Sequence, residues 1–391
     1  MKHRFTYAVI GSGMQGTAEA YDLARFGDAS RIYMADINKN LAENSAQRVN
    51  KLVKRDVAKG VCLDAKNRSD VLKLLNQCDT CCAAAHYTLN FQLTELAIES
   101  GTHFCDLGGN TGVVLRQHEL SGKAVDRDVS VVPDCGLAPG LGNVLAARAI
   151  SEFRCDSVQI RCGGLPQDPK PPLGYKIVFS PAGLTNEYTG ICTEIRDGDI
   201  VEVPAFTELE SISFPEPVGN CEAFLTSGGT STGPWSFLGK TQNYGYKTVR
   251  YPGHYSLVKA MIDLGLLDTE PLDVKGLSIV PRDLFHELIS SKLQFQDDKD
   301  LVVLRVTANG KNDNGLSVRL IQEMIDFQDN DTGFSAMERT TAYPAAIVAI
   351  MMTNREIPSG VHALENVVDG RVMIKELAKR GIDISVNIQT G

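Results

Sequence analysis

The chain has 391 residues, a formal net charge of −9, 43% hydrophobic and 22% charged residues. This length predicts two domains, each with its own core. The acidic balance argues against nucleic acid or an anionic membrane as the main partner, because both require a basic surface. The longest apolar run, Ala345 to Met352, is far shorter than the ~20 residues of a membrane-spanning helix.

The first predicted element is a buried strand, Tyr7 to Ile10, which runs into a G-x-G-x-x-G stretch and a helix over Thr17 to Phe26. In such a motif the first glycine permits a tight turn and the second lets the backbone approach a pyrophosphate. The third lets the helix pack closely on the strand. The helix N-terminus offers free N–H groups to the phosphates. The predicted cofactor-binding residues here are Gly11, Ser12, Gly13, Met14, Gln15 and Gly16.

A second predicted strand, Arg31 to Ala35, ends in Asp36, 20 residues after Gly16. A carboxylate at this spacing hydrogen-bonds the 2′-hydroxyl of the adenosine ribose. It also repels a 2′-phosphate, so NAD is favoured over NADP. No arginine stands at position 37 or 38 to favour NADP, although Lys39 is close.

Strands and helices then alternate to about residue 150. We expect further strands at 57–63, 79–85, 103–105 and 129–132, and helices at 40–54, 70–76, 91–100, 115–126 and 141–150. This alternation predicts a Rossmann-type, doubly wound parallel sheet, with ligands beyond the carboxyl ends of its strands. We assign residues 1–140 to this domain. Polar residues at those strand ends are candidate site residues by position: Asp36, Asp64, His86, Asp106 and Asp134.

From Ser157 onward the pattern changes to period-2 alternation with turns, which predicts a second α+β domain with a largely antiparallel sheet over residues 141–334. Two late strands, 301–307 and 316–326, are separated by Asn-Gly pairs typical of a hairpin. Helices are expected at 255–266 and 282–293. Residues 335–352 are interpreted as two helices broken at Pro344, and the segment 335–391 is expected to return to the first domain.

The ten cysteines are scattered, which is typical of a reducing compartment. Cys78-x-x-Cys81 has no partner pair at zinc-site spacing and leads into an apolar run, so it is interpreted as a buried strand and no metal is predicted. The basic start, Met1 to Arg4, is not followed by a signal-peptide cleavage site. We expect a cytoplasmic protein.

Several longer strings resemble the saccharopine dehydrogenase superfamily, over the stretch from the glycine-rich motif to the C-terminus. They include Gly136-Leu-Ala-Pro-Gly140, Arg161-Cys-Gly-Gly-Leu-Pro166 and Ser180-Pro-Ala-Gly-Leu184. Within the superfamily, the strings at 222–231, 246–254 and 339–344 look more like lysine 6-dehydrogenase than the saccharopine-forming reductases. Those reductases have an acid in the motif Gly-Leu-Asp-Pro-Gly where this chain has Ala138, which disfavours saccharopine chemistry.

The resemblance implies NAD-dependent oxidation of the ε-carbon of L-lysine to allysine, which cyclises to piperideine-6-carboxylate. Such a site needs a general base, an acid for the α-ammonium and a cation for the α-carboxylate. Arg250 is the first candidate for the carboxylate, because a guanidinium binds it bidentately, and Arg339 is the second. Glu187 is expected to bind the α-ammonium, and either His254 or Asp106 to act as the base.

Two alternatives remain open. One is a saccharopine or carboxynorspermidine type of dehydrogenase acting on a secondary amine, for which Lys176 and Arg161 offer extra cations. The other is an NAD-binding relative without catalysis, which has no use for Arg250, His254 or Glu187. A homodimer paired through the second domain is expected from the resemblance and from sheet edges that need cover.

Overall fold

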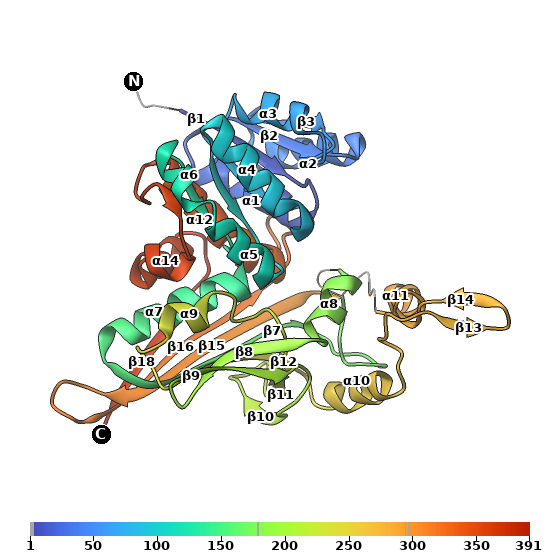
Figure 1. The fold of residues 1–391 in the computed structure, drawn as a ribbon, viewed down its shortest axis with the longest axis vertical. Coiled ribbons are helices and arrows are strands. Elements are labelled where there is room, and N and C mark those ends of the chain that lie inside the picture. The colour runs from blue at the N-terminus through green and yellow to red at the C-terminus, as the bar shows by residue number, and fades with distance from the viewer. Residues whose placement is uncertain (1–3, 178–179, 294, 296–297) are drawn as a thin grey trace.

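The computed structural model describes residues 4–177, 180–293, 295 and 298–391. Of the basic segment Met1 to Arg4 that we considered as a leader, only Arg4 lies within the described residues. Figure 1 shows two domains, with the first drawn above the long, twisted sheet of the second. Among the described residues, no helix has the length and apolar character needed to span a bilayer.

The first domain is built on a seven-stranded parallel sheet, which confirms the predicted doubly wound fold. β1 lies inside the sheet, with β2 and β3 on one side and β4, β5, β6 and β17 on the other, so the strand order reverses at β1. The strands, in spatial order, are β17 (Gly360–Val361), β6 (Ser130–Val132), β5 (His103–Asp106), β4 (Thr80–Ala83), β1 (Phe5–Ile10), β2 (Ala29–Asp36) and β3 (Ala58–Cys62).

Helices cover both faces of this sheet and bury two apolar layers against it. Several caps follow from the sequence; for example, the Asn38 side chain accepts a hydrogen bond from the amide of Leu41 and starts α2. The helix expected at 115–126 is two short helices instead, the first started by the Asn110 side chain. The helices are α1 (Met14–Phe26), α2 (Lys39–Val53), α3 (Arg68–Leu75), η1 (Tyr87–Leu89), α4 (Asn90–Ser100), α5 (Thr111–His118), α6 (Ser121–Asp126), α12 (Ala336–Thr353), α13 (Leu364–Val367) and α14 (Gly370–Ala378).

The second domain contains a nine-stranded mixed sheet that is largely antiparallel, as predicted. Its main path runs β10 (Glu210–Ser213), β11 (Asn220–Leu225), β12 (Asn243–Arg250), β7 (Arg154–Pro166), β15 (Asp300–Lys311), β16 (Ser317–Phe327) and β18 (Ser385–Thr390), while β8 (Ile191–Arg196) pairs with β12 and with β9 (Asp199–Pro204). β15 and β16 form the predicted hairpin.

Five helices and a small hairpin accompany this sheet. α7 (Gly142–Glu152) and α9 (Gly233–Phe237) lie on the side of the sheet that faces the first domain, whereas α8 (Pro181–Glu187), α10 (His254–Asp263) and α11 (Pro281–Lys292) pack around a separate aromatic core at one end. The hairpin of β13 (Leu272–Val274) and β14 (Leu277–Ile279) projects beyond α11. This aromatic core matters for function, because the candidate site lies beside it.

The C-terminal segment divides between the two sheets, whereas we expected all of it to return to the first domain. α12 packs on α1 and on strands β4 and β5, and β17 pairs with β6. The last strand, β18, instead pairs with β16 in the second sheet. The position of the boundary near residue 140 stays a prediction.

The predicted break at Pro344 is wrong, since α12 is one helix of 18 residues. A buried proline lacks the N–H that would bond the carbonyl one turn earlier, which usually ends or kinks a helix. Here the helix is buried on most sides, and both domains hold its start. The Ser335 side chain caps it, and the Asp300 carboxylate accepts hydrogen bonds from the amides of Ala336 and Met337 at 2.7 and 2.9 Å. Tertiary packing therefore outweighs the local penalty.

A buried ion pair fastens the end of α14 to α1. The Arg380 guanidinium donates to both carboxylate oxygens of Asp22 at 2.7 and 2.9 Å, and both side chains are 1% exposed. Burial raises the pKa of Asp22 to about 6, against the lowering effect of Arg380. Each of these two buried charges is therefore compensated by the other.

We predict that Arg380→Ala lowers the free energy of unfolding by about 3 to 5 kcal/mol, because it leaves the Asp22 carboxylate buried without a partner. Urea unfolding monitored by circular dichroism measures this change. Lys379→Ala is the matched control, since its ion pair with Glu376 is exposed, and we expect a change of about 1 kcal/mol or less. Equal losses in the two variants would contradict the prediction.

Candidate active site

The glycine-rich loop has the geometry of a dinucleotide-binding turn. Gly11 has a φ of +100°, and a Cβ there would lie 2.6 Å from the backbone of Ala84. A Cβ on Gly16 would lie 1.9 Å from the carbonyl oxygen of Gly11. At Gly13, in contrast, the described residues place no atom within 4 Å of the position a Cβ would take, apart from the local backbone around the glycine itself. The first and third glycines thus permit close packing, and the second borders open space where a pyrophosphate fits.

Asp36 completes this part of the site. One of its carboxylate oxygens accepts a hydrogen bond from the amide of Ser12 and the other from the amide of Asn38, both at 2.9 Å. These contacts hold the carboxylate next to the glycine-rich loop, and each oxygen retains a lone pair for a ribose hydroxyl. Lys39 lies 3.7 Å from Glu43 in an ion pair. The residues present therefore fit an adenine dinucleotide.

The other predicted cofactor-binding residues differ in their exposure and in the contacts that they make. Met14 is half exposed at the start of α1, and the Gln15 side chain donates to the carbonyl of Met337 at 3.3 Å. Asp64 is exposed and accepts from the amide of Lys66, so it closes a turn after β3. His86 caps η1 and directly follows the backbone that lies against Gly11. Their roles in cofactor binding stay predictions.

In the second domain, a cluster of buried polar groups surrounds Arg250 at the end of β12. The Arg250 side chain is 3% exposed. Its Nε donates to the Tyr188 hydroxyl at 3.0 Å and one terminal nitrogen donates to the Val249 carbonyl at 2.9 Å. The guanidinium also lies 4.7 Å from the centre of the Tyr175 ring, a cation–π contact. The other terminal nitrogen lies 3.6 Å from the Glu187 carboxylate.

Glu187 is the most accessible of these groups, because its side chain is 33% exposed at the end of α8. Burial raises the pKa of Glu187 to about 7, and the nearby positive charge of Arg250 opposes that shift. The structure brings Arg250, Glu187 and His254, all predicted from the sequence, into this one cluster.

His254 lies behind the cluster rather than at its open side, at 1% exposed. Its Nε2 is 2.8 Å from the Tyr188 hydroxyl and its Nδ1 is 3.1 Å from the Leu173 carbonyl. Burial lowers the pKa of His254 to about 3, and the charge of Arg250 lowers it further. Because both ring nitrogens have partners, the role of base that we expected for His254 does not fit this geometry.

Asp106 lies apart from that cluster, at the end of β5. Its carboxylate accepts hydrogen bonds from the amides of Gly108 and Asp134 and from the Gln117 side chain, at 2.8, 3.2 and 2.8 Å. Burial raises the pKa of Asp106, while these hydrogen bonds lower it. With three donors around it and 1% exposure, Asp106 holds the loop after β5, and the expected role of base does not fit it either.

Asp134, at the end of β6, links the two domains. Its Oδ2 accepts a hydrogen bond from Ser231, in the glycine-rich loop 226–232 that follows β11. The same loop contacts α7 of the second domain, because the Asn143 side chain donates to the Thr230 carbonyl at 3.0 Å. Asp134 is 5% exposed, and its other carboxylate oxygen is buried without a hydrogen-bond partner. Burial, together with the charge of Asp106, raises the pKa of Asp134 to about 7.

Arg339, the second arginine candidate, is a structural residue. Its guanidinium donates to both oxygens of Asp326 at 2.9 and 3.2 Å and to the carbonyl of Gly381. These contacts tie α12 to β16 and to the turn after α14, so the side chain is not available to a substrate carboxylate.

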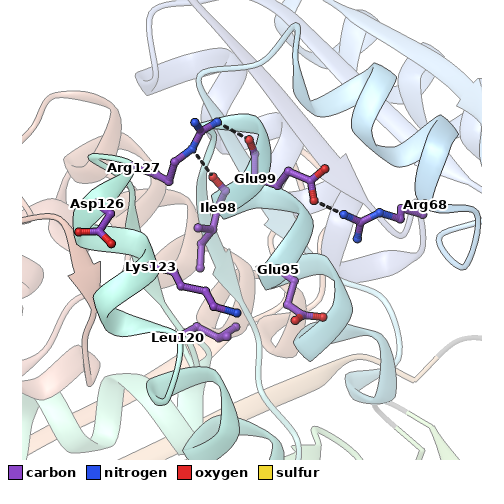
Figure 2. A pocket seen from close by; sticks show the side chains of 8 residues that line it. All are labelled: Arg68, Glu95, Ile98, Glu99, Leu120, Lys123, Asp126 and Arg127. Carbon is purple, nitrogen blue, oxygen red and sulfur yellow. Dashed lines mark hydrogen bonds and ion pairs between the residues drawn. The ribbon is translucent and has the colours of Figure 1, made fainter.

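A pocket of about 570 Å³ lies elsewhere, between α4 and α6 (Figure 2). Arg68 pairs with Glu99 there, and Arg127 donates to the carbonyls of Ile98 and Glu99 at the end of α4. Helices between parallel strands end at the edge opposite the carboxyl ends of the strands. This pocket therefore lies away from the edge where doubly wound sheets bind ligands.

Two family models match the chain: the saccharopine dehydrogenase NADP binding domain over residues 7–132 and the saccharopine dehydrogenase C-terminal domain over residues 136–382. The chain belongs to the saccharopine dehydrogenase family. It is therefore an oxidoreductase with a nucleotide-binding Rossmann domain, and the superfamily expected from the sequence is confirmed.

The relatives are distant in sequence. Saccharopine dehydrogenase (NADP(+), L-glutamate-forming) of Saccharomyces cerevisiae is 23% identical over 333 residues, which are 76% of this chain and 74% of that protein. The mitochondrial alpha-aminoadipic semialdehyde synthase of Rattus norvegicus is 24% identical over 307 residues, 61% of this chain and 33% of that protein. The chain thus spans about a third of the length of the rat relative.

A solved structure of this family has the same fold. Apo histidine-tagged saccharopine dehydrogenase (L-Glu forming) from Saccharomyces cerevisiae matches with a TM-score of 0.79 at 21% identity, over 98% of this chain and 100% of that chain. Both domains described above are therefore present in that dehydrogenase.

Three features of this candidate site were not predicted from the sequence: Tyr175, the hydrogen-bonding role of Tyr188, and the Ser231 hydroxyl. Side chains on one strand face alternate sides, so Tyr244, Tyr246, Thr248 and Arg250 of β12 share one face. That alternation was visible in the sequence and would have placed Arg250 among aromatic side chains. The loops that bring Tyr175 and Ser231 to the site left no comparable pattern.

We predict that alanine substitutions at Gly13 and Gly16 have different effects on stability and on dinucleotide binding. Gly13→Ala should leave the melting temperature nearly unchanged and weaken dinucleotide binding, because its methyl group enters only the open space. Gly16→Ala should lower the melting temperature, since its methyl group meets the Gly11 carbonyl. Thermal unfolding and calorimetric titration with NAD test both variants, and unchanged NAD affinity in Gly13→Ala would contradict the assignment of the loop.

We predict that the raised pKa of Asp134 makes the stability of the protein depend on pH. A carboxyl whose pKa is higher in the folded than in the unfolded protein binds protons on folding, so stability falls as pH rises from about 4 towards 7. Asp134→Asn should remove this part of the decline, on the order of 1 to 4 kcal/mol at 1.36 kcal/mol per pKa unit. Urea unfolding between pH 5 and 8 measures it, with exposed Asp64→Asn as the control. Parallel stability curves for wild type and Asp134→Asn would contradict it.

Proposed function

We propose that the chain catalyses the NAD-dependent oxidative deamination of the ε-amino group of L-lysine, giving allysine, which cyclises to piperideine-6-carboxylate. One observation carries this proposal: a single buried guanidinium, Arg250, lies 3.6 Å from a partly exposed carboxylate, Glu187. The pair offers opposite charges at the spacing needed by the two charged groups of one α-amino acid.

Arg250 would bind the α-carboxylate of lysine through the guanidinium edge next to Glu187, because Tyr188 and Val249 occupy its other donors. A charge-assisted hydrogen bond in such a buried place is strong and directional. Glu187 would accept hydrogen bonds from the α-ammonium. Its partial exposure gives the amino acid a way in.

The nicotinamide of bound NAD would accept a hydride from C6 of lysine at its own C4. The chain's residues bind and orient the two partners: Asp36 and the glycine-rich loop hold the dinucleotide, and Arg250 with Glu187 holds the amino acid. Water then adds to the C6 imine, releasing ammonia and leaving allysine. Before the hydride leaves, the ε-ammonium would give its proton to solvent water, because the hydrogen-bonding positions of His254 and Asp106 are already taken.

NAD is our proposed cofactor, although the matching family model and the yeast relative are both named for NADP. The support for NAD is the Asp36 carboxylate, which two backbone amides hold beside the loop. A 2′-phosphate would meet this negative charge at close range. Lys39 pairs with Glu43, so it offers weak compensation.

One alternative is a saccharopine or carboxynorspermidine type of dehydrogenase acting on a secondary amine, and the names of the relatives, which are saccharopine dehydrogenases, favour its saccharopine form. Saccharopine has more carboxylates than lysine and needs more cations. The two that the sequence offered are engaged elsewhere: Arg161 pairs with Glu210, and the Lys176 ammonium donates to the carbonyl of Asp298. Together with Ala138, where the reductases have an acid, this supports the smaller substrate.

A non-catalytic NAD-binding relative is the second alternative. It would leave the buried cluster around Arg250 without a purpose, although charges are costly to bury. The homodimer and the cytoplasmic location stay predictions from the sequence.

We predict that purified protein with NAD and L-lysine forms NADH, with far slower rates for ornithine and saccharopine and for NADP in place of NAD. Arg250→Gln should reduce kcat/KM for lysine by about 100-fold, because the carboxylate loses a charged partner. Absorbance of NADH measures both. Lys247→Gln is the matched control, as its ammonium pairs with Glu210. Turnover of saccharopine alone would favour the alternative, and no turnover while NAD still binds would overturn the lysine assignment.

A further inference from the structure

A chain of hydrogen bonds behind Arg250 runs from the guanidinium into the protein core. Arg250 Nε meets the Tyr188 hydroxyl at 3.0 Å, the hydroxyl meets His254 Nε2 at 2.8 Å, and His254 Nδ1 meets the Leu173 carbonyl at 3.1 Å. Arg250, Tyr188 and His254 are each at most 3% exposed. The reaction described above assigns no task to Tyr188 or His254.

The direction of each hydrogen bond follows from chemistry. A guanidinium can only donate, so the Tyr188 oxygen accepts from Arg250. The Leu173 carbonyl can only accept, so His254 Nδ1 carries the hydrogen. The hydroxyl oxygen has two lone pairs, so a protonated ring could also donate from Nε2 to Tyr188, but it would place a second buried positive charge beside Arg250 and deprive the hydroxyl proton of its acceptor on His254. The neutral ring, with Nε2 accepting from the hydroxyl, avoids both costs.

The surroundings of His254 favour this neutral state. The ring lies among aromatic side chains, with centroids 5.5 Å from Tyr175, 5.8 Å from Tyr188 and 6.4 Å from Phe224. His254 is also the first residue of α10, whose N-terminus carries a partial positive charge. The charged groups nearest this region are Arg250, Glu187 beside it, and Glu222, whose carboxylate accepts from amides at the start of α10.

We propose that Tyr188 and His254 are positioning residues that fix the Arg250 guanidinium for a substrate carboxylate. Neutral His254 orients the Tyr188 hydroxyl, and the hydroxyl orients Nε of Arg250 so that its far edge faces Glu187. This inference rests on the proposed function for the identity of the carboxylate, which we take to be that of an α-amino acid. The hydrogen-bond directions stand independently of the reaction.

The first test compares L-lysine with 1,5-diaminopentane, which has the same amine and lacks the carboxylate. Tyr188→Phe should lower kcat/KM for lysine by about 10- to 100-fold, the effect of losing a hydrogen bond to a charged group. It should leave kcat/KM for the diamine within about twofold. Tyr255→Phe is the matched control, because its hydroxyl donates to the Phe206 carbonyl in the same aromatic core. Equal losses with both substrates would overturn the proposal.

The second test replaces His254 in two ways. His254→Phe preserves a ring in the aromatic pocket and removes the acceptor, whereas His254→Gln retains an amide oxygen as acceptor and an N–H donor. We expect the phenylalanine variant to repeat the Tyr188→Phe pattern, with a raised KM for lysine and an unchanged kcat, and the glutamine variant to recover at least part of the loss. Equal KM values in wild type and His254→Phe would overturn the proposal.

A third test needs no substrate and therefore separates failure of this proposal from failure of the proposed reaction. The chain has seven histidines, so nitrogen-15 labelling of histidine gives a tractable NMR spectrum, with His254→Gln identifying the signal. We expect a neutral ring with hydrogen on Nδ1 throughout pH 5 to 8. Protonation of His254 within this range, or hydrogen on Nε2, would overturn the proposal even if lysine is oxidised.

Discussion

The burial of the Arg250 charge is the constraint on which the candidate site depends. A guanidinium removed from water is tolerated only with hydrogen-bond acceptors and opposite charge around it. The Tyr188 hydroxyl, the Val249 carbonyl and the Tyr175 ring supply part of this compensation, and Glu187 supplies the opposite charge beside the remaining terminal nitrogen. A ligand that carries both a carboxylate and an ammonium completes the arrangement. The proposed preference for an amino acid thus rests on the electrostatics of one buried residue.

The two halves of the site belong to different domains, and the loop after β11 joins them. Asp134 at the end of a parallel strand contacts Ser231 of this loop, and Thr226 of the same loop meets Thr248 on the face of β12 that carries Arg250. Asp300 of the second sheet holds the start of α12, which packs against the first sheet. The dinucleotide edge and the Arg250 cluster are therefore connected through several buried polar contacts. These contacts hold the dinucleotide edge and the Arg250 cluster in a fixed position relative to each other.

Much of this was predictable from the sequence because its patterns are local. The alternation of strands and helices, the glycine-rich loop, Asp36 and the β15–β16 hairpin each depend on short-range chemistry, and the structure has them where expected. The continuous α12, the return of β18 to the second sheet and the inward orientation of His254 depend on tertiary contacts instead. A histidine that titrates near neutral pH in water was a reasonable base in the sequence. In the structure, its burial beside Arg250 lowers its pKa, and hydrogen bonds occupy both of its ring nitrogens, so it does not fit the role of base.

In the proposed reaction, hydride leaves C6 of lysine, the carbon that bears the ε-amine. The most direct measurement uses L-lysine carrying two deuterium atoms at C6, incubated with the protein and NAD, followed by mass spectrometry of the reduced cofactor. We expect reduced cofactor that contains one deuterium and a cyclised product that retains the other. Unlabelled NADH from this substrate, with both deuterium atoms left in the product, would place the oxidation at another carbon and overturn the proposed reaction.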